Sequence, residues 1–369
     1  MRILVSDDQT DVLEAIRLLL KGAGHQTETV ESPRELLAEA ARGRFDLILM
    51  DMNYSRDTTS GDEGLNLLRQ LLEHDAKTPV IVMTAWSSVD LAVEAMRLGA
   101  ADFIQKPWDN ARLLATIEKQ ADLSRERNKL KSDLEIARHV QQRLLPHQAH
   151  TLKTAQYGGR CCPAREIGGD YYDFLDLGPG RLGLLIADVS GKGVGAALLT
   201  ANLQASFRSA LELGVRSPKA LLSFVNKLFH ESTPAEYYAT MFFAEYREAN
   251  CELSYINCGH PAALVVRANG GIEQLEATAL PLGIFTGWKS EEKSVELGKN
   301  DRVIAFSDGV LEAGVDDDNE FGESGLKTAL RSAPTEAGVE ALLDHVMDQV
   351  LSFSRGVQSD DVTLIALSA

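Results

Sequence analysis

The sequence is 369 residues long and carries 37 Lys and Arg against 54 Asp and Glu, a formal net charge of −17. This length predicts two or three domains, because one domain averages roughly 100–200 residues. Apolar residues make up 44% and charged residues 25%, which is ordinary for a globular protein and excludes wholesale disorder. The acidic balance argues against a nucleic-acid partner, since binding to phosphates needs clustered Lys and Arg.

Neither a membrane span nor a disulfide framework is indicated. The apolar runs are far shorter than the roughly 20 residues that cross a bilayer, so we expect no membrane insertion. The opening MRILVSDD predicts a buried strand, not a signal peptide. The four cysteines form no Cys-x-x-Cys pair, which favours reduced thiols and a cytoplasmic location.

Short apolar runs alternate with helical patterns over the first 120 or so residues. The predicted strands are Ile3–Ser6, Gln26–Val30, Phe45–Met50, Val80–Thr84 and Asp102–Gln105. Apolar spacings of 3 and 4 predict helices over 10–22, 33–42, 63–73, 88–98 and from 109 onward. This alternation predicts an α/β domain with a five-stranded, doubly wound parallel sheet. In such sheets the functional residues lie at the carboxyl ends of the strands.

Reactive side chains end or follow four of these predicted strands. They are Asp7 and Asp8, then Asp51, Thr84 and Lys106. Carboxylates gathered at one sheet edge repel each other unless a cation joins them, and hard oxygen ligands with an incomplete shell suit Mg²⁺. A carboxylate beside Mg²⁺, a lysine and a threonine hydroxyl indicates an aspartyl-phosphate site.

This motif set resembles the response-regulator receiver domain, over residues 1–119. The resemblance implies that a sensor histidine kinase phosphorylates Asp51. It also implies that Asp7 or, chiefly, Asp8 holds Mg²⁺ together with Asp51 and the carbonyl of Asn53. A folded receiver that is not phosphorylated is the alternative.

The same resemblance assigns roles on the fourth and fifth predicted strands. It implies that Lys106 binds the phosphoryl group and that Thr84 and Phe103 form a switch pair. It further implies a cis bond between Lys106 and Pro107, one of the few settings in which cis peptides occur.

Residues 120–147 have the pattern of a helical linker. The stretch lacks glycine and has one proline, Pro146, near its end. A heptad-like seam with spacings of 4 and 3 is formed by Leu130, Leu134, Ala137, Gln141 and Leu144. This predicts a parallel coiled coil that makes a homodimer; a single amphipathic helix lying on one domain is the alternative.

Residues 148–369 show strand-like runs, glycine-rich turns and helical patterns over 194–213 and 217–231. The runs YATMFFAEY, CELSYINCG and AALVVRA predict successive antiparallel strands, and DRVIAFSDG and DDVTLIALS predict two late strands. Helices grouped between antiparallel strands predict an α+β sandwich flanked by helices.

Single aspartates stand at turns in this half, beside glycine or serine: Asp170, Asp188, Asp308 and Asp360. Acids with almost no His or Cys among them suit Mn²⁺ or Mg²⁺ better than Zn²⁺. Four carboxylates can hold two such ions about 3.5–4 Å apart, an arrangement that acidifies a bridging water and clamps phosphoryl oxygens.

This half is similar to the metal-dependent protein phosphatases of the 2C type (PPM), in the SpoIIE/RsbU-like branch. The motifs are REIGGDYYD (165–173), ADVSGKGVGAAL (187–198), YYATMFFAEY (237–246), NCGHPAAL (257–264), AFSDGVLEA (305–313) and SDDVTLIAL (359–367). One departure is Lys192, where this branch commonly has a histidine.

The similarity implies a role for each acid. Asp188 bridges two Mn²⁺ or Mg²⁺ ions, and the carbonyl of Val189 binds one of them. Asp308 and Asp360 complete the shell of the other ion, and Asp170 binds directly or through water. Arg165 either reaches the phosphate or is a surface residue. His260 is either a proton donor or a residue that stabilises a turn.

Together the two resemblances predict a response regulator whose output is a protein serine/threonine phosphatase. They imply a phosphoserine protein as substrate, an anti-sigma-factor antagonist in a partner-switching pathway. The alternative is a catalytically silent, phosphatase-like adaptor controlled by the receiver. The presence of all four aspartates favours the enzyme.

Overall fold

A computed structural model describes residues 1–54, 62–85, 89–146, 152–314, 319–333, 338–356 and 358–369. These residues form two compact units, Met1–Asp133 and Leu134–Ala369. The border lies inside the long helix α5 (Asn110–Gln142), which ends before the predicted stop at Pro146. The predicted boundary between 147 and 148 lies outside the described residues and stays a prediction.

The first unit is built on a sheet with strand order β2-β1-β3-β4-β5, in which all neighbours run parallel. Its strands are β1 (Arg2–Ser6), β2 (Gln26–Val30), β3 (Leu47–Asp51), β4 (Val80–Ala85) and β5 (Asp102–Lys106). The predicted doubly wound parallel sheet is therefore confirmed.

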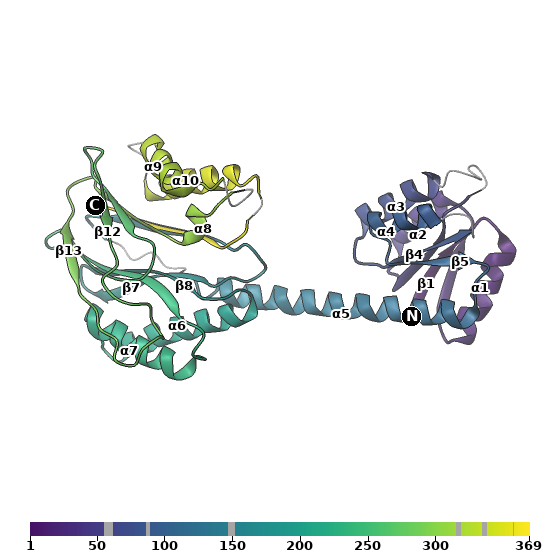
Figure 1. The fold of residues 1–369 in the computed structure, drawn as a ribbon, viewed down its shortest axis with the longest axis horizontal. Helices are drawn as coiled ribbons and strands as arrows, with labels where there is room; N and C mark the ends of the chain where they lie inside the picture. Colours follow the sequence, from purple (N-terminus) through teal and green to yellow (C-terminus); the bar gives the residue numbers. More distant parts are fainter. Residues whose placement is uncertain (55–61, 86–88, 147–151, 315–318, 334–337, 357) are drawn as a thin grey trace. The chain divides into compact units, whose positions relative to one another are not determined.

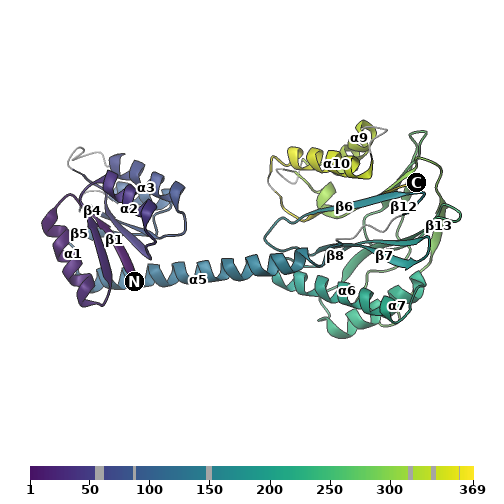
Figure 2. The ribbon, with the colours of Figure 1, turned by 180° about the vertical axis from the view of Figure 1, so that it is seen from behind.

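Helices cover both faces of this sheet (Figures 1 and 2). Alternate β1 residues point to opposite faces, as the two-residue period of a strand requires. Ile3 packs with the helices α1 (Thr10–Gly22) and α5, whereas Leu4 packs on the side of α2 (Pro33–Arg42), α3 (Asp62–His74) and α4 (Val89–Leu98). Because both faces are covered, the carboxyl edge is where polar side chains can meet.

The second unit contains two antiparallel sheets of five strands, with orders β13-β10-β9-β8-β7 and β12-β11-β14-β15-β6. The strands are β6 (Gln156–Cys162), β7 (Asp170–Gly178), β8 (Arg181–Val189), β9 (Ala239–Arg247), β10 (Glu252–Cys258), β11 (Ala263–Val266), β12 (Ile272–Leu275), β13 (Lys293–Glu296), β14 (Arg302–Phe306) and β15 (Val362–Ser368). The predicted antiparallel sandwich is confirmed.

The three successive strands predicted in this unit are antiparallel, but they are divided between the two sheets. β9 and β10 pair with each other, whereas β11 pairs with β12 and β14 in the other sheet. The chain leaves the first sheet after Cys258, where Gly259 has a φ of 69° and Pro261 offers no backbone N–H to a ladder. A local strand pattern does not show which of the two sheets the next strand will join.

Helices flank both sheets of the second unit (Figures 1 and 2). Helices α6 (Val194–Glu212) and α7 (Pro218–Ser232) pack on the sheet that contains β7, β8 and β9. Helices α9 (Gly322–Ser332) and α10 (Val339–Phe353) pack on the other sheet, and a short helix, α8 (Asp308–Leu311), follows β14. A third core lies between the sheets.

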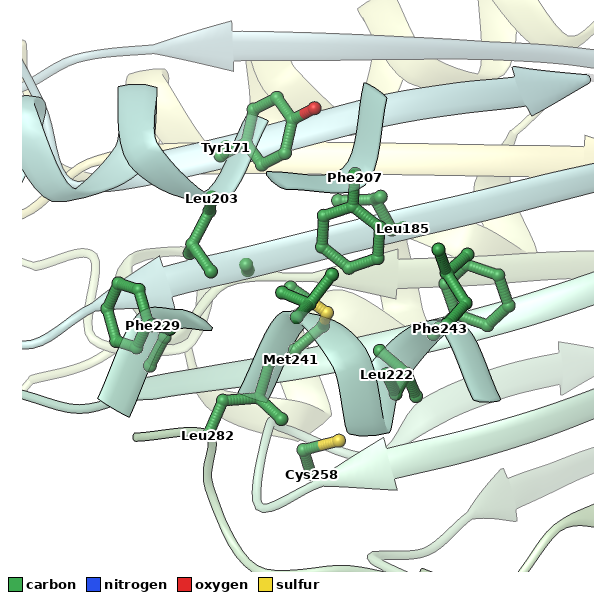
Figure 3. Packing of buried hydrophobic residues seen from close by; sticks show 14 of the residues in the cluster. Tyr171, Leu185, Leu203, Phe207, Leu222, Phe229, Met241, Phe243, Cys258 and Leu282 are labelled. Atoms are coloured by element: carbon green, nitrogen blue, oxygen red, sulfur yellow. The ribbon is translucent and has the colours of Figure 1, made fainter. Parts of the chain in front are cut away.

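The core beneath α6 and α7 supports the ends of β7 and β8 (Figure 3). Phe207 of α6 stacks on Phe243 of β9 with ring centroids 6.4 Å apart. Tyr171 of β7 and Leu185 of β8 are fully buried in the same core. This packing fixes the strand ends on which Asp170 and Asp188 stand.

Candidate functional site

Three carboxylates meet at the carboxyl edge of the parallel sheet. Oxygens of Asp7, Asp8 and Asp51 lie within 4.8 Å of one another. Lys106 Nζ lies 2.6 Å from Asp7 Oδ2 and 3.0 Å from Asp51 Oδ1. The peptide bond that follows, Lys106–Pro107, is cis, as expected. The structure thus brings together four of the predicted receiver residues.

Burial and crowding change the ionisation of Asp51. Its pKa is raised to about 6, chiefly by burial and further by Asp7, while Lys106 opposes the rise. Asp7 is fully buried and bound to Lys106, whereas Asp8 is half-buried. Crowded oxygen donors that resist ionisation fit a divalent cation, which would offset their repulsion.

The remaining predicted receiver residues lie on β4, on β5 and just after β3. Thr84 is buried on β4, and Phe103 of β5 is 39% exposed and opposite Val82. Asn53 follows Asp51 by two residues and is half-buried. Sequence reasoning did not find Tyr54, whose buried hydroxyl lies 2.8 Å from Ser6 Oγ. No sequence motif predicts that contact, because the two residues are 48 positions apart.

The acids of the second unit gather where strands end. Asp170 at the start of β7 is the register partner of Asp188 near the end of β8. Asp308 opens α8 just after β14, and Asp360 precedes β15. The pKa of Asp188 is raised to about 7 by burial, then by the charges of Asp308, Asp360 and Asp361. All four predicted acids therefore belong to one electrostatic cluster.

Two further observations describe the donors of this cluster. Burial and then Asp188 raise the pKa of Asp170 well above its usual range, and Asp170 Oδ2 has no hydrogen-bond partner among the described residues. Within the described part of the chain, no three of these acids approach as closely as the receiver acids do. Mutually repelling carboxylates with a free buried oxygen fit divalent cations.

A second layer of hydrogen bonds holds the loop that carries Asp170. Asp361 accepts from the backbone N–H of Ala164 at 2.8 Å and of Gly169 at 2.7 Å. A side chain on Gly168 would collide with the Asp361 carboxylate, so only glycine fits there. Thr200 Oγ1 donates to Gly169 O over 2.8 Å. Sequence analysis had not assigned Asp361 this positioning role.

Val189 follows Asp188 and lies against the same loop. A Cβ on Gly169 would come within 2.9 Å of the Val189 carbonyl oxygen. The carbonyl of this predicted ligand therefore lies beside the segment that leads to Asp170.

Two cations stand beside the acids. Lys192 Nζ lies 2.8 Å from Asp360 Oδ2 and 3.0 Å from Ser359 O. Arg165 is exposed, and its charge opposes the rise in the pKa of Lys192 that Asp360 causes. Arg165 and Asp170 both line a cavity of about 300 Å³. The charges of Lys192 and Arg165 therefore lie close enough to affect each other.

Burial shifts the pKa of two other polar residues of this unit, Glu312 and His260, in opposite directions. Glu312, which sequence analysis did not assign, has a pKa raised by burial and by Asp308 and Asp360. His260 is buried, its Nδ1 lies 2.9 Å from Thr240 Oγ1, and burial lowers its pKa to about 3. A histidine that stays neutral at physiological pH suits a turn better than proton donation.

Comparison with known proteins identifies both units. Residues 178–369 match the family model described as Stage II sporulation protein E (SpoIIE). The chain belongs to the SpoIIE family. The match covers Asp188, Asp308 and Asp360 and begins after Asp170. Residues 3–118 match the response regulator receiver domain.

Curated relatives of this SpoIIE-family chain include two phosphatases. It is 30% identical over 239 residues to phosphoserine phosphatase RsbU of Bacillus subtilis (strain 168), covering 64% of this chain and 70% of RsbU. It is 29% identical over 185 residues to phosphoserine phosphatase RsbP of the same organism, covering 49% of this chain and 46% of RsbP. The receiver half is 36% identical over 117 residues to the transcriptional regulatory protein ZraR of Escherichia coli (strain K12), 32% of this chain and 25% of ZraR.

Solved structures support the fold of the second unit. The SiaA-PP2C domain of Pseudomonas aeruginosa superposes with a TM-score of 0.59 at 18% identity, covering 66% of this chain and 98% of that domain. The PP2C phosphatase domain of SpoIIE from Bacillus subtilis gives a TM-score of 0.51 at 21% identity, covering 58% and 62%. This SpoIIE-family chain is a protein serine/threonine phosphatase fused to a receiver, and phosphatases of this type depend on metal ions. The helices of the described residues are all too short or too polar to span a bilayer.

Proposed function

We propose that a sensor histidine kinase phosphorylates Asp51, and that this modification regulates removal of phosphate from a phosphoserine or phosphothreonine protein. The observation that carries the catalytic half is the cluster around Asp188. Its pKa of about 7 reflects burial together with the charges of Asp308, Asp360 and Asp361, and buried carboxylates that repel one another are suited to binding cations.

In the phosphatase, Asp170, Asp188, Asp308 and Asp360 with the Val189 carbonyl would hold two Mn²⁺ or Mg²⁺ ions. When bound, such ions supply Lewis-acid stabilisation of phosphoryl oxygens and acidify water. Lys192 and Arg165 attract the substrate phosphate and orient it against the acids. Asp361 keeps the Asp170 loop in place through the Ala164 and Gly169 amides.

In the receiver, Asp8 and Asp51 with the Asn53 carbonyl would hold one Mg²⁺ ion. An Asp51 oxygen attacks the phosphorus of a phosphohistidine, so that a P–O bond forms as the P–N bond breaks. Lys106 already lies 3.0 Å from Asp51 Oδ1 and balances the added charge. Thr84 and Phe103 carry the change away from the site.

The substrate class is proposed from the relatives. RsbU and RsbP are both named phosphoserine phosphatases. A phosphoserine on an anti-sigma-factor antagonist in a partner-switching pathway is therefore the favoured substrate. We further propose receiver, linker and phosphatase segments of 1–119, 120–147 and 148–369, with a homodimer formed through the linker helix.

Hydrolysis of p-nitrophenyl phosphate and of a phosphoserine protein by the full-length chain tests these roles. Turnover should require Mn²⁺ or Mg²⁺ and should fall at least about 100-fold in Asp188→Ala. Asp348→Ala, an exposed aspartate on α10, is the matched control and should keep wild-type activity. Metal-independent turnover, or turnover unchanged by Asp188→Ala, would contradict the proposed site. No turnover with retained binding of the phosphoprotein would instead identify an adaptor.

A further inference from the structure

The last turn of α5 contacts the loop that carries Asp170. Gln141 Nε2 donates to Gly168 O over 2.7 Å, and the Gly168 N–H donates to Gln141 Oε1 over 3.1 Å. The side-chain amide therefore pairs with both polar groups of one glycine, as a neighbouring strand would. Gly168 stands two residues before Asp170.

Gly168 has little freedom to move without its neighbours. A side chain there would collide with the Asp361 carboxylate, and that carboxylate also accepts from Gly169 N at 2.7 Å and Asp170 N at 3.4 Å. Thr200 fixes the carbonyl of Gly169 from α6. A shift of Gly168 would therefore be passed to the backbone of Asp170.

A cavity lies beside the contact between Gln141 and Gly168. The cavity of about 300 Å³ is lined by Arg138 and Gln141 of α5 together with Cys162 of β6 and Asp170 of β7. Leu145, just beyond the helix, packs against the two cores nearby. Because a cavity lies beside the hydrogen bonds of Gln141, this contact can change locally while the buried cores stay packed.

We propose that Gln141 is a positioning residue, which sets the Asp170 loop and thereby the metal affinity of the phosphatase site. Groups that orient metal ligands commonly change metal affinity by 10–100-fold when they are removed. Residues nearer the start of the same helix, Leu113, Ile117 and Ala121, are buried in the receiver core. The helix that packs in the receiver core thus also carries the residue that contacts the Asp170 loop. This inference rests on the proposed metal site.

Mn²⁺ titration by calorimetry on full-length protein tests the proposal, with Gln141→Leu against Gln142→Leu. Gln142 is the next residue of the helix and is exposed, so the two variants differ in little but the bridge to Gly168. Gln141→Leu should weaken Mn²⁺ binding at the phosphatase site about 10-fold, and Gln142→Leu should not. Mn²⁺ binding at the receiver site is the same in all the proteins compared, so it does not affect the difference between the variants.

Kinetics separate positioning from a general loss of structure. Gln141→Leu should lose turnover at low Mn²⁺ and regain it at saturating Mn²⁺, with KM for the phosphoprotein unchanged. Gln141→Glu keeps the acceptor for Gly168 N–H but loses the donor, so its Mn²⁺ affinity should lie between the wild type and Gln141→Leu. It also replaces Gln141→Leu if that variant does not fold.

Regulation gives an independent readout. If beryllofluoride, a phosphoryl mimic, changes wild-type turnover, that response should shrink in Gln141→Leu and persist in Gln142→Leu. Equal Mn²⁺ affinity in all variants would overturn the proposal. A wild type that binds Mn²⁺ without turnover would overturn the proposed function instead, and the affinity comparison would still decide the role of Gln141.

Discussion

Lys192 Nζ lies 2.8 Å from Asp360 Oδ2, so a fixed cation is bound to one of the acids expected to bind metal. The side chain of Lys192 is 50% exposed, and its amine also contacts Ser359 O at 3.0 Å. Its charge has two opposite effects. It repels a divalent ion and occupies Asp360, but it attracts a phosphate group.

Lys192→Gln should therefore tighten Mn²⁺ binding and weaken substrate binding. Because the pair is partly exposed, we expect a gain on the order of 1 kcal/mol in Mn²⁺ binding, or about fivefold. KM for a phosphoprotein should rise because a positive charge is lost near the phosphate. Calorimetry without substrate and steady-state kinetics at saturating Mn²⁺ measure the two effects separately.

Lys227→Gln is the control for this substitution. Lys227 is exposed on α7 and lies 4.0 Å from Glu231 in a surface pair. It should change neither Mn²⁺ affinity nor KM. Weaker Mn²⁺ binding in Lys192→Gln would mean that the lysine organises Asp360 for the metal instead of competing with it.

Asp51→Asn should stabilise the metal-free receiver at pH 8 while removing its response to a phosphoryl mimic. The folded-state pKa of Asp51 is about 6, above its usual 3.8. The contribution of the Asp51 carboxyl to the free energy of unfolding is therefore complete below pH 3.8 and is lost as the pH rises through 6. Removing the charge at pH 8 should raise the free energy of unfolding by on the order of 1–3 kcal/mol. Urea unfolding at pH 8 and pH 4 measures this.

The pH dependence identifies the cause. The gain from Asp51→Asn should shrink toward zero at pH 4, where the wild-type carboxyl is largely protonated. Asp133→Asn, at an exposed position of α5, should show no such difference. A gain that is equal at both pH values would point to packing and not to charge.

The ends of strands were predictable from the sequence, whereas contacts between distant segments were not. Asp51 and Asp188 follow apolar runs, so their place at a sheet edge follows from local pattern. The hydrogen bonds of Asp361 to Gly169 and of Gln141 to Gly168 join residues 192 and 27 positions apart. No local pattern encodes such pairs.

Gln141 shows what a spacing pattern leaves open. The heptad spacing placed it in a seam facing a second helix, yet its side chain binds Gly168 of its own chain. Leu130 of the same seam is 61% exposed, so a dimer along that part of α5 stays a prediction. Spacing identifies one face of a helix but not what covers that face.

The metal-free phosphatase should lose stability as the pH rises. The pKa of Asp188 is raised from 3.8 to about 7. The contribution of the Asp188 carboxyl to the free energy of unfolding is therefore complete below pH 3.8, its unfolded pKa, and is lost as the pH rises through 7. The unfolding temperature should fall between pH 5 and pH 8, and Mn²⁺ should raise it more at pH 8. Calorimetric melts with and without Mn²⁺ measure both changes.

Asp188→Asn should flatten this profile, since the residue no longer ionises. Asp348→Asn, exposed on α10, should leave the profile as it is in the wild type. If Asp188→Asn and wild type lose the same stability toward pH 8, another group of the cluster dominates the titration.

Thr200→Val should weaken the metal site without altering its charge. The buried Thr200 hydroxyl donates to Gly169 O over 2.8 Å, and valine keeps its shape while removing the donor. Leaving a buried carbonyl without this donor should cost about 1–3 kcal/mol of stability. Part of the loss should appear as weaker Mn²⁺ binding, because Gly169 is joined directly to Asp170. Ser206→Ala removes another buried hydroxyl of α6, which donates to Asn202 Oδ1 at 3.5 Å and not to the Asp170 loop. If both variants lower Mn²⁺ affinity equally, the effect comes from the packing of α6 and not from the bond to Gly169.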